Sequence, residues 1–268
     1  MNTTSEKSSD APKSIRFLGL SLECISYAGM FLRFDEWIRN RGQRGHAVAA
    51  VNVNCCVSGL LDSRLRRLYQ QADLLGIDSM PFLYAARLLK NKHSDRLYAP
   101  DMMLETAKVA RSRGYKFFLY GGSAGAPDAM VGMLRKVAPE VEIAGLYSPP
   151  FRALTAEEDD VICTTILGSG ANMVWVGLGS PKQDAWIAEH LEKLPGCVLI
   201  ASGATFDFFS GRIKQAPRWV RNTGFEWLFR LTQDPGRLWK RYTVYNFLFL
   251  SALALELIGI LRLDGKEP

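Results

Sequence analysis

Carboxylates, carboxamides and arginines follow several of the strands that this sequence predicts. Asp78 comes after a short apolar strand and before a helix that Pro81 opens. A carboxylate between a strand end and a helix start is held by rigid elements and can serve as a general base facing a cleft. The alternative is that Asp78 only caps the following helix.

Asn52 and Asn54 end the strand predicted at residues 46–53. Two carboxamides at a strand end suit ligand contact, although capping of a helix at 58–71 explains Asn54 equally well and Asn52 somewhat less well. Arg96 stands in a polar turn after Asp95. It either neutralises a phosphate or pairs with Asp95 on the surface.

Glycine turns follow two further strands. Residues 173–176 form a short apolar run, after which come Gly177, Gly179 and Pro181, with helical spacing of apolar residues from Lys182 onward. A helix N-terminus at the carboxyl end of a parallel strand binds anions, so a diphosphate is the expected ligand, although an ordinary tight turn explains such glycines equally well. Gly121 and Gly122 repeat this arrangement after the strand at 116–120.

The elements that position these residues alternate between strand and helix. We expect strands at 15–20, 46–53, before Asp78, at 116–120, 141–145, 173–176 and from 199. Helices are expected between them, including 30–41, 58–71 and 102–113. This alternation predicts an α/β fold with a Rossmann-like parallel sheet flanked by helices, which binds ligands over the strand carboxyl ends. The order of glycines is not GxGxxG and no strand-end acid follows at the dinucleotide spacing, which disfavours a dehydrogenase.

Composition narrows the class of protein. The chain has 268 residues, 48% of them hydrophobic, and a net charge of +6, which favours anionic partners. The five cysteines form no CxxC pair and the three histidines are scattered, so we expect a reducing cytosol, no metal site and no cofactor. Residues 1–14 are polar without periodicity and lack a secretory signal, which predicts a disordered tail.

Residues 211–268 form a basic and then apolar segment that we expect to be an appendage to a core at 15–210. Its basic residues are interleaved with tryptophans and phenylalanine, as at a membrane interface or a nucleic-acid surface. They are Arg212, Lys214, Arg218, Arg221, Arg230, Arg237, Lys240 and Arg241, against only Glu226 and Asp234. The mostly apolar run at 244–261 contains Glu256, which favours seating at a membrane interface or docking on the protein over a membrane span. A nucleic-acid partner is disfavoured.

Several motifs in order resemble the WecG/TagA/CpsF family of bacterial glycosyltransferases. They are GLGSPKQDAW at residues 177–186 and, within 206–242, FDFFSG, APRW, EWLFR and PGRLWKRY. The resemblance extends from about Arg16 to Tyr242. It implies inverting, metal-independent transfer of a sugar from a UDP-sugar to a polyprenyl-diphosphate-linked saccharide, and an appendage that meets the membrane and helps to close the active site.

The resemblance also assigns residues. Asp78 matches the family's proposed catalytic base, and Asn52 and Arg96 match neighbouring catalytic motifs. The predicted substrate-binding residues are Asp101, Gly121, Gly122, Gly177, Gly179, Pro181, Lys182, Gln183, Asp184, Asp207, Arg230, Arg237 and Arg241. The sequence departs from the family pattern at Ala50, where threonine is usual, and at Ser79, Ala99 and Asp184. Loss of the threonine hydroxyl suggests a compensating group or a different acceptor.

The sequence therefore predicts a peripheral enzyme on the cytoplasmic face of the inner membrane, acting in cell-surface or exopolysaccharide synthesis. Its expected partners are the UDP-sugar, the lipid-linked acceptor and the anionic membrane surface, and self-association into a homo-oligomer stays open. The alternative is a non-catalytic partner in the same pathway that binds UDP-sugar or lipid.

Overall fold

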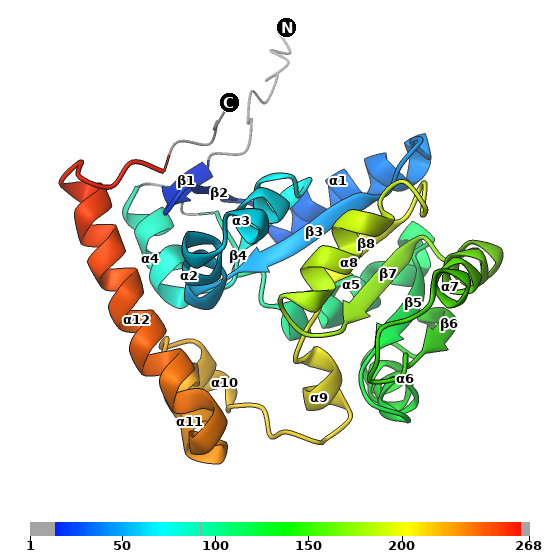
Figure 1. Cartoon of the computed structure of the whole chain (residues 1–268). Coiled ribbons are helices and arrows are strands. Elements are labelled where there is room, and N and C mark those ends of the chain that lie inside the picture. The colour runs from blue at the N-terminus through cyan, green and yellow to red at the C-terminus, as the bar shows by residue number, and fades with distance from the viewer. Residues whose placement is uncertain (1–13, 90, 92, 264–268) are drawn as a thin grey trace, which may run out of the picture.

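The computed structural model describes residues 14–89, 91 and 93–263. Within this part of the chain, helices flank an eight-stranded sheet with the order β1-β2-β4-β3-β8-β7-β5-β6 (Figure 1). All neighbouring strands run parallel except the first pair. The predicted α/β fold with a largely parallel sheet is therefore confirmed. The tail expected at 1–14 lies outside the described residues, apart from Ser14.

The elements have the following bounds. The strands are β1 Ser14–Phe17, β2 Leu20–Glu23, β3 His46–Val51, β4 Leu74–Ile77, β5 Lys116–Gly121, β6 Glu142–Tyr147, β7 Met173–Gly177 and β8 Val198–Ala201. The helices of the core are α1 Tyr27–Asn40, α2 Val53–Leu61, α3 Ser63–Gln70, α4 Met80–Leu88, α5 Ala99–Arg113, α6 Ala126–Val137, α7 Ala156–Gly168, α8 Lys182–His190 and α9 Thr205–Phe209. The C-terminal helices are α10 Arg218–Arg221, α11 Glu226–Gln233 and α12 Pro235–Leu257.

The side chains of strand β7 are buried on both faces of the sheet. Met173 and Trp175 pack into the core cluster that α1, α5 and α6 cover, while Val174 and Val176 pack into the cluster beneath α7 and α8. Successive side chains of a strand point to opposite faces, so a continuous apolar run indicates a strand covered on both sides. This confirms the strand expected at 173–176.

Two predicted elements are wrong in their extent. The single strand expected at 15–20 is a hairpin, in which the chain turns at Leu18 and Gly19 with φ of 46° and 78°. The single helix expected at 58–71 belongs to α2 and α3, which are separated at Asp62. The Asp62 carboxylate accepts a hydrogen bond from the Arg64 amide at 2.8 Å, and such a side chain starts a new helix by capping it.

The C-terminal helix α12 begins before the predicted apolar run and lies along α2 (Figure 1). Phe249 of α12 is buried against Phe17 and Phe82, and the Glu256 carboxylate accepts a hydrogen bond from the Leu18 amide at 2.9 Å. One face of α12 is therefore part of the protein core. In the described part of the chain, no helix is long and apolar enough to cross a membrane.

Candidate active site

Asp78 lies at the carboxyl end of β4, next to the end of β3. Its amide donates to the Val51 carbonyl at 2.9 Å, which extends the pairing of the two strands. Its carboxylate Oδ2 accepts from Asn52 Nδ2 at 3.1 Å. Helix α4 has Ser79 as its N-cap, so the alternative in which Asp78 caps this helix is wrong. The carboxylate is 16% exposed, so it is held by the protein but reachable.

Asn52 has two roles at once. Its Oδ1 accepts from the Cys55 amide at 3.2 Å as the N-cap of α2, and its Nδ2 donates to Asp78. A carboxamide has both an acceptor and a donor, so one side chain can end the strand, start the helix and orient the carboxylate. The capping alternative is confirmed for Asn52, on a helix that begins at Val53, and contact of Asn52 with a ligand stays a prediction.

Arg96 connects Asp78 to the C-terminal helices. Its Nη2 donates to Asp78 Oδ1 at 3.2 Å and to Glu226 Oε2 at 3.1 Å, and its Nε donates to the Asp78 carbonyl. The alternative partner Asp95 instead accepts from the Tyr27 amide at 2.8 Å. The surface pairing of Arg96 with Asp95 is therefore wrong.

The surroundings of Asp78 favour its neutral form. Burial raises the pKa of the carboxyl group most strongly, Arg96 opposes this, and the negative charge of Glu226 adds to the rise. A carboxylate whose pKa is raised from its usual value is a stronger base, and it is better matched to accepting a proton near neutral pH.

Asp184, in the first turn of α8, is a second carboxylate near this point. Its Oδ2 accepts from the Tyr69 hydroxyl at 3.3 Å, and burial raises its pKa. Burial raises the pKa of the Cys55 thiol to about 12, and the negative charges of Asp184 and Asp78 add to this rise. The turn after β7 therefore lies beside the ends of β3 and β4, as expected of a site over the strand carboxyl ends.

Gln183 ties the start of α8 to the loop after β8. It is buried, and its Oε1 accepts from the Gly203 amide at 2.9 Å. Pro181 and Lys182 are exposed beside it. Gly179 has a φ of 77° and open space where a Cβ would lie. Direct contact of these four residues with a substrate stays a prediction.

The glycines at the ends of β5 and β7 leave space that the side chain of Phe206 fills. A Cβ on Gly177 would lie 2.1 Å from Phe206 Cδ2, and one on Gly122 would lie 2.8 Å from Phe206 Cδ1. A Cβ on Gly121 would lie 2.5 Å from the Gly177 backbone. These glycines therefore allow close contact between β5, β7 and α9, and contact of the glycines with a ligand stays a prediction.

The remaining predicted site residues take part in contacts with the C-terminal segment. Asp101 pairs with Arg221 at 2.7 Å, and Asp207 lies 3.6 Å from Arg212. The Arg230 guanidinium lies 5.5 Å from the centre of the Phe208 ring. Arg237 and Arg241 belong to α12, but their side chains are outside the described part of the structure.

Sequence reasoning missed Glu226, Tyr98 and Arg221 as part of this site. Tyr98 donates to Glu226 Oε1 at 2.7 Å, and the Arg221 carbonyl accepts from Arg96 at 3.0 Å. Glu226 was visible only as one of two acidic residues in a basic segment. The available signal was the scarcity of acidic residues in this segment, because an acid among many arginines is expected to pair with an arginine.

The structure also brings together a Cys/His group that the sequence did not predict. Asp159, Cys163 and His190 place one ligand-type atom each within 4.8 Å of one another. His190 Nε2 lies 2.8 Å from Asp159 Oδ1, and its Nδ1 lies 2.6 Å from the Trp186 carbonyl. Since protein oxygens occupy both ring nitrogens, the contact serves to join α7 and α8.

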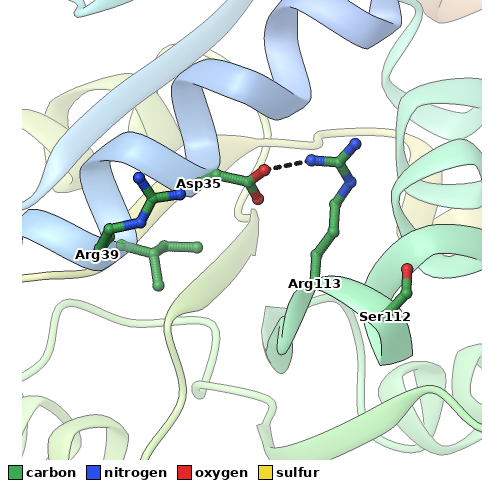
Figure 2. A pocket seen from close by; sticks show the side chains of 5 residues that line it. Asp35, Arg39, Ser112 and Arg113 are labelled. Carbon is green, nitrogen blue, oxygen red and sulfur yellow. Dashed lines mark hydrogen bonds and ion pairs between the residues drawn. The ribbon is translucent and has the colours of Figure 1, made fainter.

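A separate hollow lies away from these residues. It has a volume of ≈ 520 Å³, lies between α1 and α5, and is lined by Asp35, Ile38, Arg39, Ser112 and Arg113. Figure 2 shows the Asp35–Arg113 ion pair spanning it. It contains none of the predicted site residues and is not the candidate active site.

The fold and the site define an α/β enzyme with its polar residues gathered where parallel strands end. The sequence model described as "Glycosyl transferase WecG/TagA/CpsF family" matches residues 15–262. The chain belongs to this family and is a glycosyltransferase. It is also similar to an N-acetylglucosaminyldiphosphoundecaprenol N-acetyl-beta-D-mannosaminyltransferase of Bacillus subtilis (strain 168), with 28% identity over 197 residues, or 74% of this chain and 75% of the relative.

Proposed function

We propose that this protein transfers a sugar, with inversion and without a metal ion, from a UDP-sugar to a polyprenyl-diphosphate-linked saccharide in bacterial cell-surface or exopolysaccharide synthesis. The observation that carries the proposal is the carboxylate of Asp78, oriented by Asn52 and Arg96 at the carboxyl ends of β3 and β4. The family membership supplies the class of reaction.

Asp78 is the general base in this proposal. Its carboxylate accepts the proton of the acceptor hydroxyl while the oxygen attacks the anomeric carbon of the donor. The bond from that carbon to the UDP oxygen breaks on the opposite face, which inverts the configuration. The departing diphosphate needs cationic or amide donors, and the N-terminus of α8 with the exposed arginines of the C-terminal segment can supply them.

The donor and acceptor are proposed from the similar Bacillus protein. Its name describes transfer of N-acetylmannosamine to an N-acetylglucosaminyl-diphosphoundecaprenol. We therefore propose a diphosphate-linked polyprenyl saccharide as acceptor and place UDP-N-acetylmannosamine first among donors to test. Ala50 replaces the usual threonine of the family pattern, which suggests a compensating group or a different acceptor, so extracted acceptors are tested together with a panel of donors.

We also propose that the protein works at the cytoplasmic face of the inner membrane as a peripheral protein. Trp219, Trp239, Phe247 and Leu250 are exposed in the basic C-terminal segment. Exposed aromatic residues among cations favour the headgroup region of an anionic membrane.

The test is mass spectrometry of the products from a panel of UDP-sugars incubated with extracted lipid-linked saccharides. Wild-type protein should yield one new glycosylated lipid. Asp78→Asn should lower the rate by about 10²-fold or more, because it removes the base, while UDP affinity measured by titration calorimetry stays close to that of wild type. Wild-type turnover in this variant would contradict the assignment of the base. UDP binding without any product would favour a non-catalytic partner.

A further inference from the structure

The C-terminal segment contacts Arg96, the partner of Asp78, through the acidic side chain of Glu226. Glu226, the first residue of α11, accepts hydrogen bonds from Arg96 Nη2 at 3.1 Å and from the Tyr98 hydroxyl at 2.7 Å. The same Arg96 nitrogen contacts Asp78 at 3.2 Å. The side chains of Glu226, Arg96 and Asp78 are 12%, 15% and 16% exposed. One guanidinium therefore pairs with two partly buried carboxylates, one from the core and one from the C-terminal segment.

A second ion pair joins the same two parts of the chain. Arg221 of α10 binds Asp101 of α5 at 2.7 Å. The guanidinium groups of Arg96 and Arg221 lie 4.5 Å and 5.5 Å from the centre of the Tyr98 ring. Gln215 donates to the Tyr98 hydroxyl at 3.2 Å. These contacts hold α10 and the start of α11 against the loop that carries Arg96.

Arg96 has few donors left for a substrate in this arrangement. Its Nε donates to the Asp78 carbonyl, its Nη1 to the Arg221 carbonyl, and its Nη2 to both carboxylates. A guanidinium has five N–H groups, so Arg96 is mostly committed to the protein. Its position fits the orientation of Asp78 better than it fits binding of the diphosphate.

We propose that Glu226 is a positioning residue, which couples docking of the C-terminal segment to the strength of Asp78 as a base. The inference rests on the proposed role of Asp78. When α11 is docked, Arg96 pairs with the carboxylates of both Glu226 and Asp78. When α11 is undocked, Arg96 acts on Asp78 alone and stabilises its carboxylate, which weakens it as a base. The enzyme would then activate an acceptor hydroxyl, or water, only with the segment in place.

The other groups that face Asp78 do not substitute for Glu226. Burial raises the pKa of Asp78, Arg96 lowers it and Glu226 raises it. Tyr98 and Cys55 also face this carboxylate, but burial raises the pKa of both further above neutral pH, so neither carries charge there. Among these neighbours, Glu226 is the negative charge that α11 can bring or remove.

The first test is the pH profile of kcat for Glu226→Gln. This variant keeps the shape of the side chain and one of its two acceptor oxygens but removes its charge. We expect the acidic limb to move to lower pH by about one unit, since an unopposed cation within contact distance lowers an aspartate pKa by 1–3. The plateau rate should fall severalfold with little change in the donor KM. Glu226→Asp keeps the negative charge, so the acidic limb of its pH profile should lie closer to that of wild type. The exposed Glu140→Gln should leave the pH profile unchanged.

The second test does not depend on finding a substrate. The pKa of Asp78 is measured by carbon NMR of protein with labelled aspartate carboxyl groups, with Asp78→Asn used to assign the signal. It should fall in Glu226→Gln and stay unchanged in Glu140→Gln. An unmoved Asp78 signal in Glu226→Gln would overturn the inference. If the signal moves but no donor reacts with wild type, the coupling stands and the proposed function fails.

Discussion

At the scale of single residues, two aspartates with raised pKa occupy different surroundings. Asp78 has the cation of Arg96 beside it, whereas the contacts of the Asp184 carboxylate are the hydroxyls of Tyr69 and Ser180. Neutral donors compensate less of the cost of burying a charge than a cation does. Asp184 should therefore reduce stability at neutral pH.

Asp184→Asn is predicted to stabilise the protein increasingly as pH rises. A carboxyl group whose pKa is raised on folding contributes stability that is full below its unfolded pKa and is lost as pH rises through its folded pKa. Asparagine does not titrate, so the variant escapes this loss. Urea unfolding between pH 4 and 8 should show the difference from wild type growing with pH. The same difference at both ends of that range would contradict the prediction, and the exposed Glu192→Gln serves as control.

Gln183→Ala should affect both stability and donor use. It removes the acceptor of the Gly203 amide and leaves that partly buried donor without its partner. We expect a loss of about 1 kcal/mol in the free energy of unfolding and a higher donor KM, since α8 is no longer tied to the neighbouring loop. Denaturant unfolding and steady-state kinetics measure the two effects. Gln43→Ala, in an exposed turn, should change neither, and a stable variant with altered KM would assign Gln183 to the substrate instead.

At the scale of elements, the ends of β5 and β7 and the short helix α9 are packed around a single ring. Phe206 occupies the space that side chains at Gly122 and Gly177 would fill. The glycines bring the two strand ends and α9 close together, which positions the turn that leads into α8.

Gly177→Ala is predicted to destabilise the protein by roughly 1–3 kcal/mol, as overpacking of a core does. The new methyl group would lie 2.1 Å from the Phe206 ring, so the strand end or α9 must move. The matched control is Gly132→Ala in α6, where the Cβ meets open space. It should stabilise by about 0.5–1 kcal/mol because alanine suits a helix interior better. Thermal unfolding compares the two, and equal effects would contradict the packing argument.

At the scale of the whole molecule, α12 has two apolar faces with different surroundings. Phe249 and Ala252 are buried against the core, whereas Phe247 and Leu250 are exposed. The sequence left open whether this segment seats in a membrane or packs on protein. One face packs on protein, and attachment to a membrane through the other face stays a prediction.

Phe247→Ala and Phe249→Ala should separate these two roles. Phe247 is 70% exposed, so its replacement should change stability by less than about 0.5 kcal/mol but reduce co-sedimentation with anionic liposomes at low salt. Phe249 is 6% exposed, and its loss should cost about 3–5 kcal/mol of folding stability. Unchanged sedimentation of Phe247→Ala would argue against membrane attachment through this face.

Local pattern in the sequence was sufficient for the parallel sheet, the strand–turn–helix units and the placement of Asp78 and Asn52 at strand ends. Hydrophobic periodicity and turn residues act over a few positions, so they can be read from a single chain. Only the tertiary structure decided the hairpin at Leu18, the docked face of α12 and the meeting of Glu226 with Arg96 across 130 residues. These depend on burial and on contacts between distant segments, which local periodicity does not encode.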